Sequence, residues 1–199
     1  MVYATLVVED VLQEAVAHKA IASEKIPLAI YRTLGMQGSG FIDANLGRLA
    51  RASSHGRYIV VRDLDKHECA PALRRRLLDG PVPPGLLLAI AVKEVEAWLL
   101  ADSPSFRRFF NVHRIEGSPE SIEEPKERLV SLARSSRKRS VREGVVPRGT
   151  GRVGDLYNAI LLDFIKSSWR VGRARRRAPS LERFVQSLSA LGAGEGRTS

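Results

Sequence analysis

The first half of the chain alternates apolar runs with segments whose apolar residues recur at helical spacing. Short runs rich in β-branched and aliphatic residues predict β-strands at residues 2–8, 26–32, 58–63 and 86–92. Helical patterns follow these runs at residues 11–21, from the glycine-rich segment to about residue 54, at 68–78 and at 93–102. Strands that alternate with helices favour an α/β fold, with a mainly parallel sheet of about four strands covered by helices on both faces.

The strand pattern disappears after residue 102, and short helices are expected from there on. The final segment carries an apolar stripe at i, i+3, i+4 and i+7, made by Leu181, Phe184, Val185, Leu188 and Leu191. A second stripe is made by Leu156, Ile160, Leu161, Phe164 and Ile165. Both stripes predict helices that pack on the body of the protein. We therefore predict an α/β core at 1–102, a basic helical extension at 103–192 and a disordered tail at 193–199.

Charge is distributed unevenly along the chain. The net charge is +10, with 12 basic against 11 acidic residues in 1–100 and 20 against 11 in 101–199. The excess includes two runs whose members are Arg134, Arg137, Lys138, Arg139, Arg142, Arg173, Arg175, Arg176 and Arg177. A basic half suits a polyanionic partner, with DNA or RNA ahead of a membrane surface. A GC-rich genome also produces arginine-rich chains, and the first run could be a solvated loop or a surface for an acidic protein.

The sequence does not predict a membrane protein, a disulfide-bonded protein or a Cys-x-x-Cys zinc protein. No apolar run approaches the roughly 18 to 20 residues of a membrane span, and the first segment turns acidic too early for a signal peptide. We expect a cytoplasmic protein. Cys69 is the single cysteine, which excludes an internal disulfide and a Cys-x-x-Cys zinc site, and a buried free thiol is expected.

Acidic residues recur where predicted strands end. Glu9 follows the first strand, and Asp63 and Asp65 end the third, although Asp is a poor strand former. Glu94 and Glu96 begin the helix after the fourth strand, and Glu14 lies one turn into the first helix. Because the carboxyl ends of parallel strands share one rim, these side chains should meet there. Carboxylates without His or Cys partners select Mg²⁺ or Mn²⁺, which complete their shells with water and phosphate.

Each of these acidic positions also has a structural explanation. Asp65 could cap a helix that begins near His67, and Glu94 with Glu96 would complement a helix dipole. Glu9 could simply end a strand.

The glycine-rich segment from Gly35 to Ile42 has the first spacing of a phosphate-binding P-loop. The Lys and Ser or Thr that such a loop needs are replaced by Phe41 and Ile42, which excludes an ATP site of that kind. Its backbone could still face a nucleic-acid phosphate, or it could be a plain connector.

Several motifs together resemble a known family. "LVVED" and "VVRDLD" resemble the two acidic motifs of the Toprim domain, which topoisomerases, bacterial primases and overcoming-lysogenisation-defect nucleases share. More closely, "VVEDVLQEAV", "DLDKHECAPAL", "IAVKEVEAWLLAD", "EEPKERLVSLAR" and "LYNAILLDFI" resemble, in order, a bacterial and archaeal Toprim-like family of unknown function. The resemblance implies that Glu9, Asp63 and Asp65 are metal ligands. It implies a role at the site less directly for Glu14, Glu94 and Glu96. Asp10 departs from the glycine that commonly follows the first Glu.

The resemblance narrows the expected function to a nuclease. A topoisomerase needs a further domain with a nucleophilic tyrosine, and a primase brings a zinc module that one cysteine cannot build. A metal-bound water would attack a phosphodiester, with Glu9 as base or bridging ligand and Lys66 and Lys93 as charge stabilisers. The resemblance also implies an ABC- or AAA-type ATPase partner in a bacterial defence system. The alternative is a noncatalytic nucleic-acid-binding or assembly subunit, and a homo-oligomer stays open.

Overall fold

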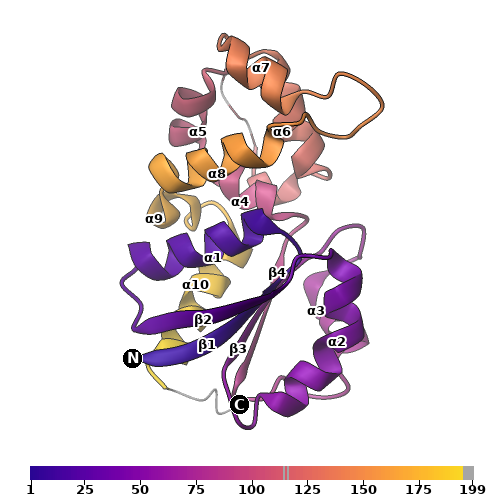
Figure 1. Ribbon diagram of the computed structural model, residues 1–199, viewed down its shortest axis with the longest axis vertical. Coiled ribbons are helices and arrows are strands. Elements are labelled where there is room, and N and C mark those ends of the chain that lie inside the picture. The colour runs from indigo at the N-terminus through magenta and orange to yellow at the C-terminus, as the bar shows by residue number, and fades with distance from the viewer. Residues whose placement is uncertain (114, 116, 195–199) are drawn as a thin grey trace.

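The protein is an α/β protein built on one parallel sheet (Figure 1). The computed structural model describes residues 1–113, 115 and 117–194. The strands are β1 (Val2–Val8), β2 (Leu28–Gly35), β3 (Tyr58–Asp63) and β4 (Leu86–Ala91). They lie in the order β2-β1-β3-β4, and every neighbouring pair is parallel. The fold predicted from the alternating pattern is confirmed.

Helices connect the strands and make up most of the second half. Those in the first half are α1 (Val11–Ser23), α2 (Ser39–Ala52), α3 (Ala70–Leu77) and α4 (Val95–Ala101). The second half contains α5 (Ser103–Phe110), the 3₁₀ turn η1 (Pro119–Ser121), α6 (Pro125–Arg134), α7 (Arg139–Val145), α8 (Tyr157–Ser167), α9 (Val171–Ala174) and α10 (Pro179–Gly192).

The sheet is buried on both faces, which explains why its strands read as continuous apolar runs. One face, which includes Leu6 and Ile59, packs in a large cluster with α1, α4, α8 and α10. The other face, which includes Val7 and Val60, packs in a smaller cluster with α2 and α3. Successive residues of one strand therefore belong to different cores, as the alternation of side chains along a strand requires.

The helices of the second half pack against the sheet domain. Helix α8 packs on α1, and α10 packs on β4 and β2. The Trp98 ring on α4 stacks on Phe184 of α10 with centroids 5.5 Å apart. The predicted stripe of α10 is buried at all five positions. Of the tail predicted at 193–199, Ala193 and Gly194 directly follow α10, and residues 195–199 lie outside the described residues.

Four local expectations are corrected. Strand β2 is displaced toward the glycine segment, because it continues beside β1 as far as Gly35. Helix α3 begins at Ala70 with Cys69 as its N-cap, so Asp65 does not cap it. Leu156, which was predicted to face the core, is the N-cap of α8 and is 55% exposed. Cys69 is half-buried rather than buried.

Gly35 has a packing role that requires glycine. Its φ is +97°, and a Cβ atom would lie 2.2 Å from the carbonyl oxygen of Val8. Beyond it, the Gly38 N–H donates to the carbonyl oxygen of Glu9 at 3.1 Å. The glycine segment is thereby held against the end of β1.

No helix in the described part of the chain is long and apolar enough to cross a membrane.

Candidate functional site: a carboxylate cluster at the strand ends

Two of the predicted carboxylates lie side by side at the carboxyl ends of β1 and β3. Glu9 directly follows β1, and Asp63 is the last residue of β3. The two strands are neighbours in the sheet, and Glu9 Oε1 accepts a hydrogen bond from the Asp63 N–H at 2.7 Å. Asp63 Oδ1 in turn accepts from the Val95 N–H at the start of α4 at 3.0 Å. The sheet topology thus brings together residues that are 54 positions apart.

A cation that the sequence analysis did not single out lies among the carboxylates. The guanidinium of Arg62 pairs with Glu9 at 3.3 Å, with Asp43 at 3.0 Å and with Asp65 at 2.6 Å. Its side chain is only 3% exposed, and it also donates to the carbonyl oxygen of Asp63. A charged residue inside an otherwise apolar strand was the signal for it, since buried arginine needs anionic partners. The sequence analysis also missed Asp43 on α2, which is one of these anionic partners.

A second cation comes from the helical half. Lys126, near the start of α6, lies 3.6 Å from Glu94 and 3.5 Å from Glu96. Its backbone N–H donates to Glu94 Oε2 at 2.9 Å, and the Tyr157 hydroxyl donates to Glu96 Oε1 at 2.9 Å. Helices α6 and α8 therefore complete the environment of carboxylates that begin α4.

Burial and mutual repulsion perturb the ionisation of the cluster. Burial, with repulsion from Glu96 and Glu9, raises the pKa of Asp63 well above its usual value. Burial likewise raises the pKa of Glu9 and of Glu96. Burial acts to lower the pKa of Lys126, but the surrounding carboxylates raise it, so this ammonium stays charged. The site combines buried acids with a strongly held cation, which is a frequent property of functional sites.

Two buried polar atoms beside the cluster have no hydrogen-bond partner in the described part of the chain. They are Glu96 Oε2 and Gln13 Nε2. Gln13 uses its other amide atom, Oε1, to accept from the Glu9 N–H at 2.9 Å. Unpaired buried polar atoms are uncommon in native structures, so both atoms have unused hydrogen-bonding capacity beside the cluster.

The residue that departs from the Toprim pattern has a clear local role. Asp10 is the N-cap of α1, and its Oδ1 accepts from the N–H groups of Leu12 and Gln13 at 2.9 and 3.0 Å. Its φ of −152° is extended backbone, so no glycine is required at this position.

The remaining predicted site residues lie at the margin. Glu14 is half-buried in the first turn of α1, and no hydrogen bond or ion pair joins its side chain to the described cluster. Lys66 is exposed, and its charge acts to lower the pKa of Glu124, the residue before α6. Lys93 is half-buried and contributes its carbonyl oxygen, which accepts from the Asp65 N–H at 2.8 Å.

The donor set has the chemistry that Mg²⁺ or Mn²⁺ prefers, but the observed arrangement does not form a metal cage. Within the described residues, no group of three or more His, Cys, Asp or Glu side chains is placed to hold a metal ion. Arg62 and Lys126 occupy the positions between the carboxylates instead. As arranged here, the predicted ligands Glu9 and Asp65 pair with Arg62, whereas the buried Asp63 carboxylate accepts from the Val95 N–H.

The two basic runs differ in how far their charges are already used. In the first run, Arg134 and Arg137 are exposed, while Lys138 and Arg142 donate to carbonyl oxygens and Arg139 pairs with Glu143. This run surrounds the start of α7, at the upper end of the molecule in Figure 1.

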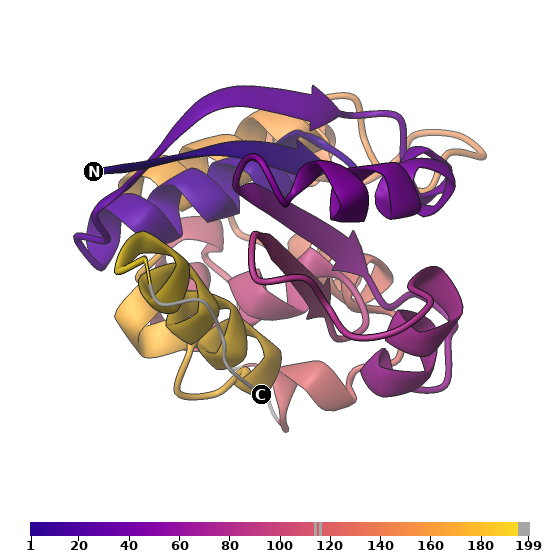
Figure 2. The same cartoon turned by 90° about the horizontal axis from the view of Figure 1, so that it is seen from below.

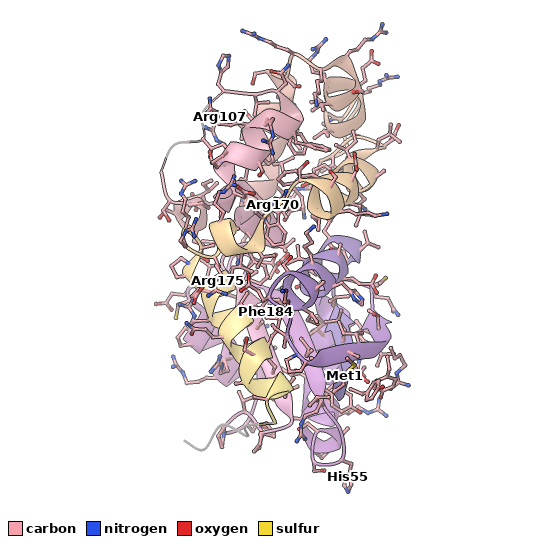
Figure 3. The ribbon with its side chains drawn as sticks, turned by 90° about the vertical axis from the view of Figure 1, so that its left-hand side faces the viewer. Met1, His55, Arg107, Arg170, Arg175 and Phe184 are labelled. Carbon is pink, nitrogen blue, oxygen red and sulfur yellow. The ribbon has the colours of Figure 1, made fainter. Side chains whose placement is uncertain are left out.

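The second run is mostly committed to contacts within the protein. Arg173 pairs with the buried Asp102 at 3.1 Å, and Arg175 pairs with Glu24 at 2.6 Å and Glu182 at 2.8 Å. Arg177 donates to carbonyl oxygens, and Arg176 is exposed. Figure 3, which looks at the left-hand side of Figure 1, shows Arg175 on that side. Strands β1 and β2 point toward the opposite side of the molecule (Figure 1).

The fold and site together define an α/β protein with a parallel four-stranded sheet and a buried carboxylate cluster at its carboxyl edge. No protein-family model, curated protein or solved structure matches the chain.

Proposed function

We propose that this protein is a Toprim-like nuclease subunit that hydrolyses phosphodiester bonds of DNA or RNA with Mg²⁺ or Mn²⁺. The observation that carries the proposal is the pair of the half-buried Glu9 and the buried Asp63, which lie at the ends of adjacent parallel strands and have raised pKa values. Carboxylates held so close in a buried site repel one another, and binding of a divalent cation would relieve that repulsion. When bound, such an ion supplies an activated water and stabilises charge on the phosphate.

The contribution of the protein's own residues follows from their positions. The Asp63 N–H orients the Glu9 carboxylate, and the Val95 N–H orients that of Asp63. Arg62 and Lys126 neutralise part of the negative charge that would otherwise repel a nucleic acid. The exposed arginines of the first basic run would bind the phosphate backbone at a distance from the cluster.

A second candidate is a noncatalytic subunit that binds nucleic acid or assembles with an ABC- or AAA-type ATPase. It is favoured by the neutralisation of the cluster by Arg62 and Lys126, together with the lack of a converging ligand group in the described residues. In this case the acidic cluster only positions α6 against the sheet.

The first test is cleavage of mixed DNA and RNA substrates in Mg²⁺ and in Mn²⁺. The wild type would be compared with Asp63→Asn/Asp65→Asn and with Asp163→Asn, an exposed carboxylate on α8. We expect metal-dependent cleavage that the double substitution abolishes and that Asp163→Asn leaves unchanged. Mn²⁺ binding, measured by electron paramagnetic resonance, should likewise be lost in the double substitution and unchanged in Asp163→Asn.

Absence of both cleavage and Mn²⁺ binding in the wild type would contradict the nuclease and support the noncatalytic subunit. Cleavage that survives in Asp63→Asn/Asp65→Asn would place the chemistry elsewhere in the protein.

A salt titration tests the nucleic-acid contact independently of cleavage. Arg134→Gln/Arg137→Gln should reduce the slope of log affinity against log salt by about one to two, because each lost phosphate contact releases about one counterion fewer. Arg75→Gln/Arg76→Gln, on exposed positions of α3, is the matched control and should leave the slope unchanged. Equal slopes in all three proteins would exclude the first basic run as the contact surface.

A further inference from the structure

Strand β4 is an edge strand with an open outer side. It pairs with β3, and no further strand follows it in the described sheet. The Tyr58 N–H donates to Gly85 and the Leu64 N–H donates to Ala91, so the odd-numbered residues of β4 direct their polar groups to β3. By the alternation of a strand, Leu88 and Ile90 direct theirs to the open side.

A groove runs along this open side. All five residues from Leu86 to Ile90 line it. These five residues retain 5 to 7% exposure, whereas residues 59–61 of the inner strand β3 retain none. The length of β4 that is open to the groove therefore corresponds to an added strand of about five residues.

Helices form the two walls of the groove. Figure 2 shows α10 and α3 on opposite sides of the sheet at this edge, with β4 between them. Phe184 and Leu191 line the α10 wall, and Ala70 and Val82 line the opposite wall. An inserted strand would meet apolar surface on both faces, which requires a continuous apolar run rather than an alternating one.

At both ends of the groove, the outward N–H groups of β4 already have acceptors within the protein. At one end the hydroxyl of Ser180 already accepts from the Val92 N–H at 3.3 Å, which uses the next outward polar group of the strand. At the other end Pro83 and Pro84 line the groove, and the Leu86 N–H donates to the Pro83 carbonyl oxygen at 2.9 Å. Among the described residues, no hydrogen bond is found for the outward polar groups of Leu88 and Ile90.

The rim of the groove is positively charged. Arg74 on α3 and Arg183 on α10 line it from opposite walls, and both are exposed. None of the described residues that line the groove is acidic. Acidic residues on either side of an apolar segment would therefore be attracted to this rim.

We propose that the β4 groove binds an extended segment of a partner protein, a run of four or five apolar residues flanked by acidic residues, as a fifth strand. Main-chain hydrogen bonds to Leu88 and Ile90 would give affinity, and Arg74 and Arg183 would select the flanking charges. A second copy of this chain fits the groove poorly, because its own β4 is recessed between the same two helices. This inference does not depend on nuclease activity.

The probe is a fluorescein-labelled hexapeptide with four central Val and Ile residues between two glutamates. We expect saturable binding to the full chain by fluorescence anisotropy. A peptide with lysines in place of the glutamates should bind at least about tenfold more weakly. A peptide N-methylated at alternate central residues should also lose binding, because it lacks donors for strand pairing.

Variants of the protein locate the binding site. Ala190→Arg places a long side chain in the groove and should abolish binding. Ser189→Arg, on the exposed side of the same helix, is the matched control and should bind as the wild type does. Arg74→Glu/Arg183→Glu should invert the preference so that the lysine-flanked peptide binds more tightly. Circular dichroism would verify that each variant is folded.

Three results would overturn the proposal. Equal binding of the glutamate and lysine peptides would contradict charge selection, and binding that survives in Ala190→Arg would place the site elsewhere. A dimer in sedimentation equilibrium that Ala190→Arg dissociates and Ser189→Arg does not would assign the groove to a second copy of the chain.

Discussion

At the scale of single residues, the sheet edge concentrates buried charges that stabilise one another only in part. Arg62 is enclosed by acceptors, whereas Asp63 is buried next to other acids. Loss of the Arg62 cation is therefore costly, and so is ionisation of the Asp63 carboxyl group. The two residues are adjacent in sequence, yet their substitution should have opposite effects on stability.

Asp63→Asn should stabilise the protein increasingly as pH rises. The folded-state pKa of Asp63 lies above its usual value of 3.8, so the folded form prefers the neutral acid. The contribution of Asp63 to the free energy of unfolding is therefore fully present below pH 3.8 and declines as pH rises through the raised pKa. The asparagine does not ionise and can still accept from the Val95 N–H, and we expect an increase in Tm on the order of 2–4 °C near neutral pH.

The measurement is Tm against pH for the wild type, Asp63→Asn and the exposed control Asp163→Asn. A difference between Asp63→Asn and wild type that does not change with pH would contradict a raised pKa in the folded protein.

Arg62→Met should destabilise the protein strongly. It leaves the half-buried Glu9, whose side chain is 12% exposed, without its ionic partner, and breaking a buried pair by removing one member costs about 3–5 kcal/mol. Arg139→Met is the matched control, because Arg139 also pairs with a carboxylate at 2.8 Å but is 81% exposed. It should leave the free energy of unfolding nearly unchanged, because exposed ion pairs contribute little to stability. Urea unfolding would measure both, and a similar cost for the two substitutions would mean that burial of the Arg62 pair is unimportant.

At the scale of elements, one serine joins α10 to the sheet and to α4. The Ser180 hydroxyl accepts from the Trp98 indole N–H at 2.7 Å and from the Val92 N–H, and it donates to Glu120. The apolar stripe of α10 predicts that the helix packs on the body, but such a stripe has no unique position along the helix axis. The hydrogen bonds of Ser180 determine which residues of α10 face β4.

Ser180→Ala should reduce the free energy of unfolding by about 1–3 kcal/mol, since it leaves the buried Trp98 indole N–H without an acceptor. Ser189→Ala removes a hydroxyl that donates to the Val185 carbonyl oxygen of its own helix, and it should be nearly neutral. Chemical denaturation would compare the two variants. A neutral Ser180→Ala would show that the indole finds another acceptor.

Local rules fail at element boundaries when a tertiary neighbour decides the outcome. Strand β2 extends to Gly35 because β1 supplies a pairing partner over its whole length. The sequence pattern predicted the strand at 26–32 because the apolar residues are concentrated there, closer to α1 than the observed strand is. Helix α3 begins at Ala70 rather than near residue 68 for a local reason, since Pro71 is favoured in the first turn of a helix.

At the scale of the whole molecule, the two halves share one hydrophobic core. The large cluster extends from β1 to α10 without interruption. Trp169, before α9, donates its indole N–H to the Trp98 carbonyl oxygen of α4 at 3.2 Å. A division at residue 102 therefore describes a change of secondary structure, and we expect the halves to fold together.

We predict a single cooperative unfolding transition for the full chain. Tryptophan fluorescence reports on the contact between the halves, because Trp98 and Trp169 both lie there, and far-ultraviolet circular dichroism reports on all helices. The two urea transitions should coincide within error. A fluorescence change that precedes the loss of helix would indicate two independent folding units. A chain that ends at residue 102 should fail to fold, because its sheet would lose α8 and α10.

Taken by itself, the sequence determined the class of fold, the number of strands and the acidic residues at their ends. These follow from the spacing of apolar residues and from the rule that parallel strands end at one rim. The contacts of Arg62 with Glu9 and of Lys126 with Glu96 were decided only by the tertiary structure, because these residues lie far apart along the chain, whereas the contact of Arg62 with Asp65 is local. For the same reason only the folded chain shows β4 as the open edge, since the order β2-β1-β3-β4 depends on how the sheet pairs.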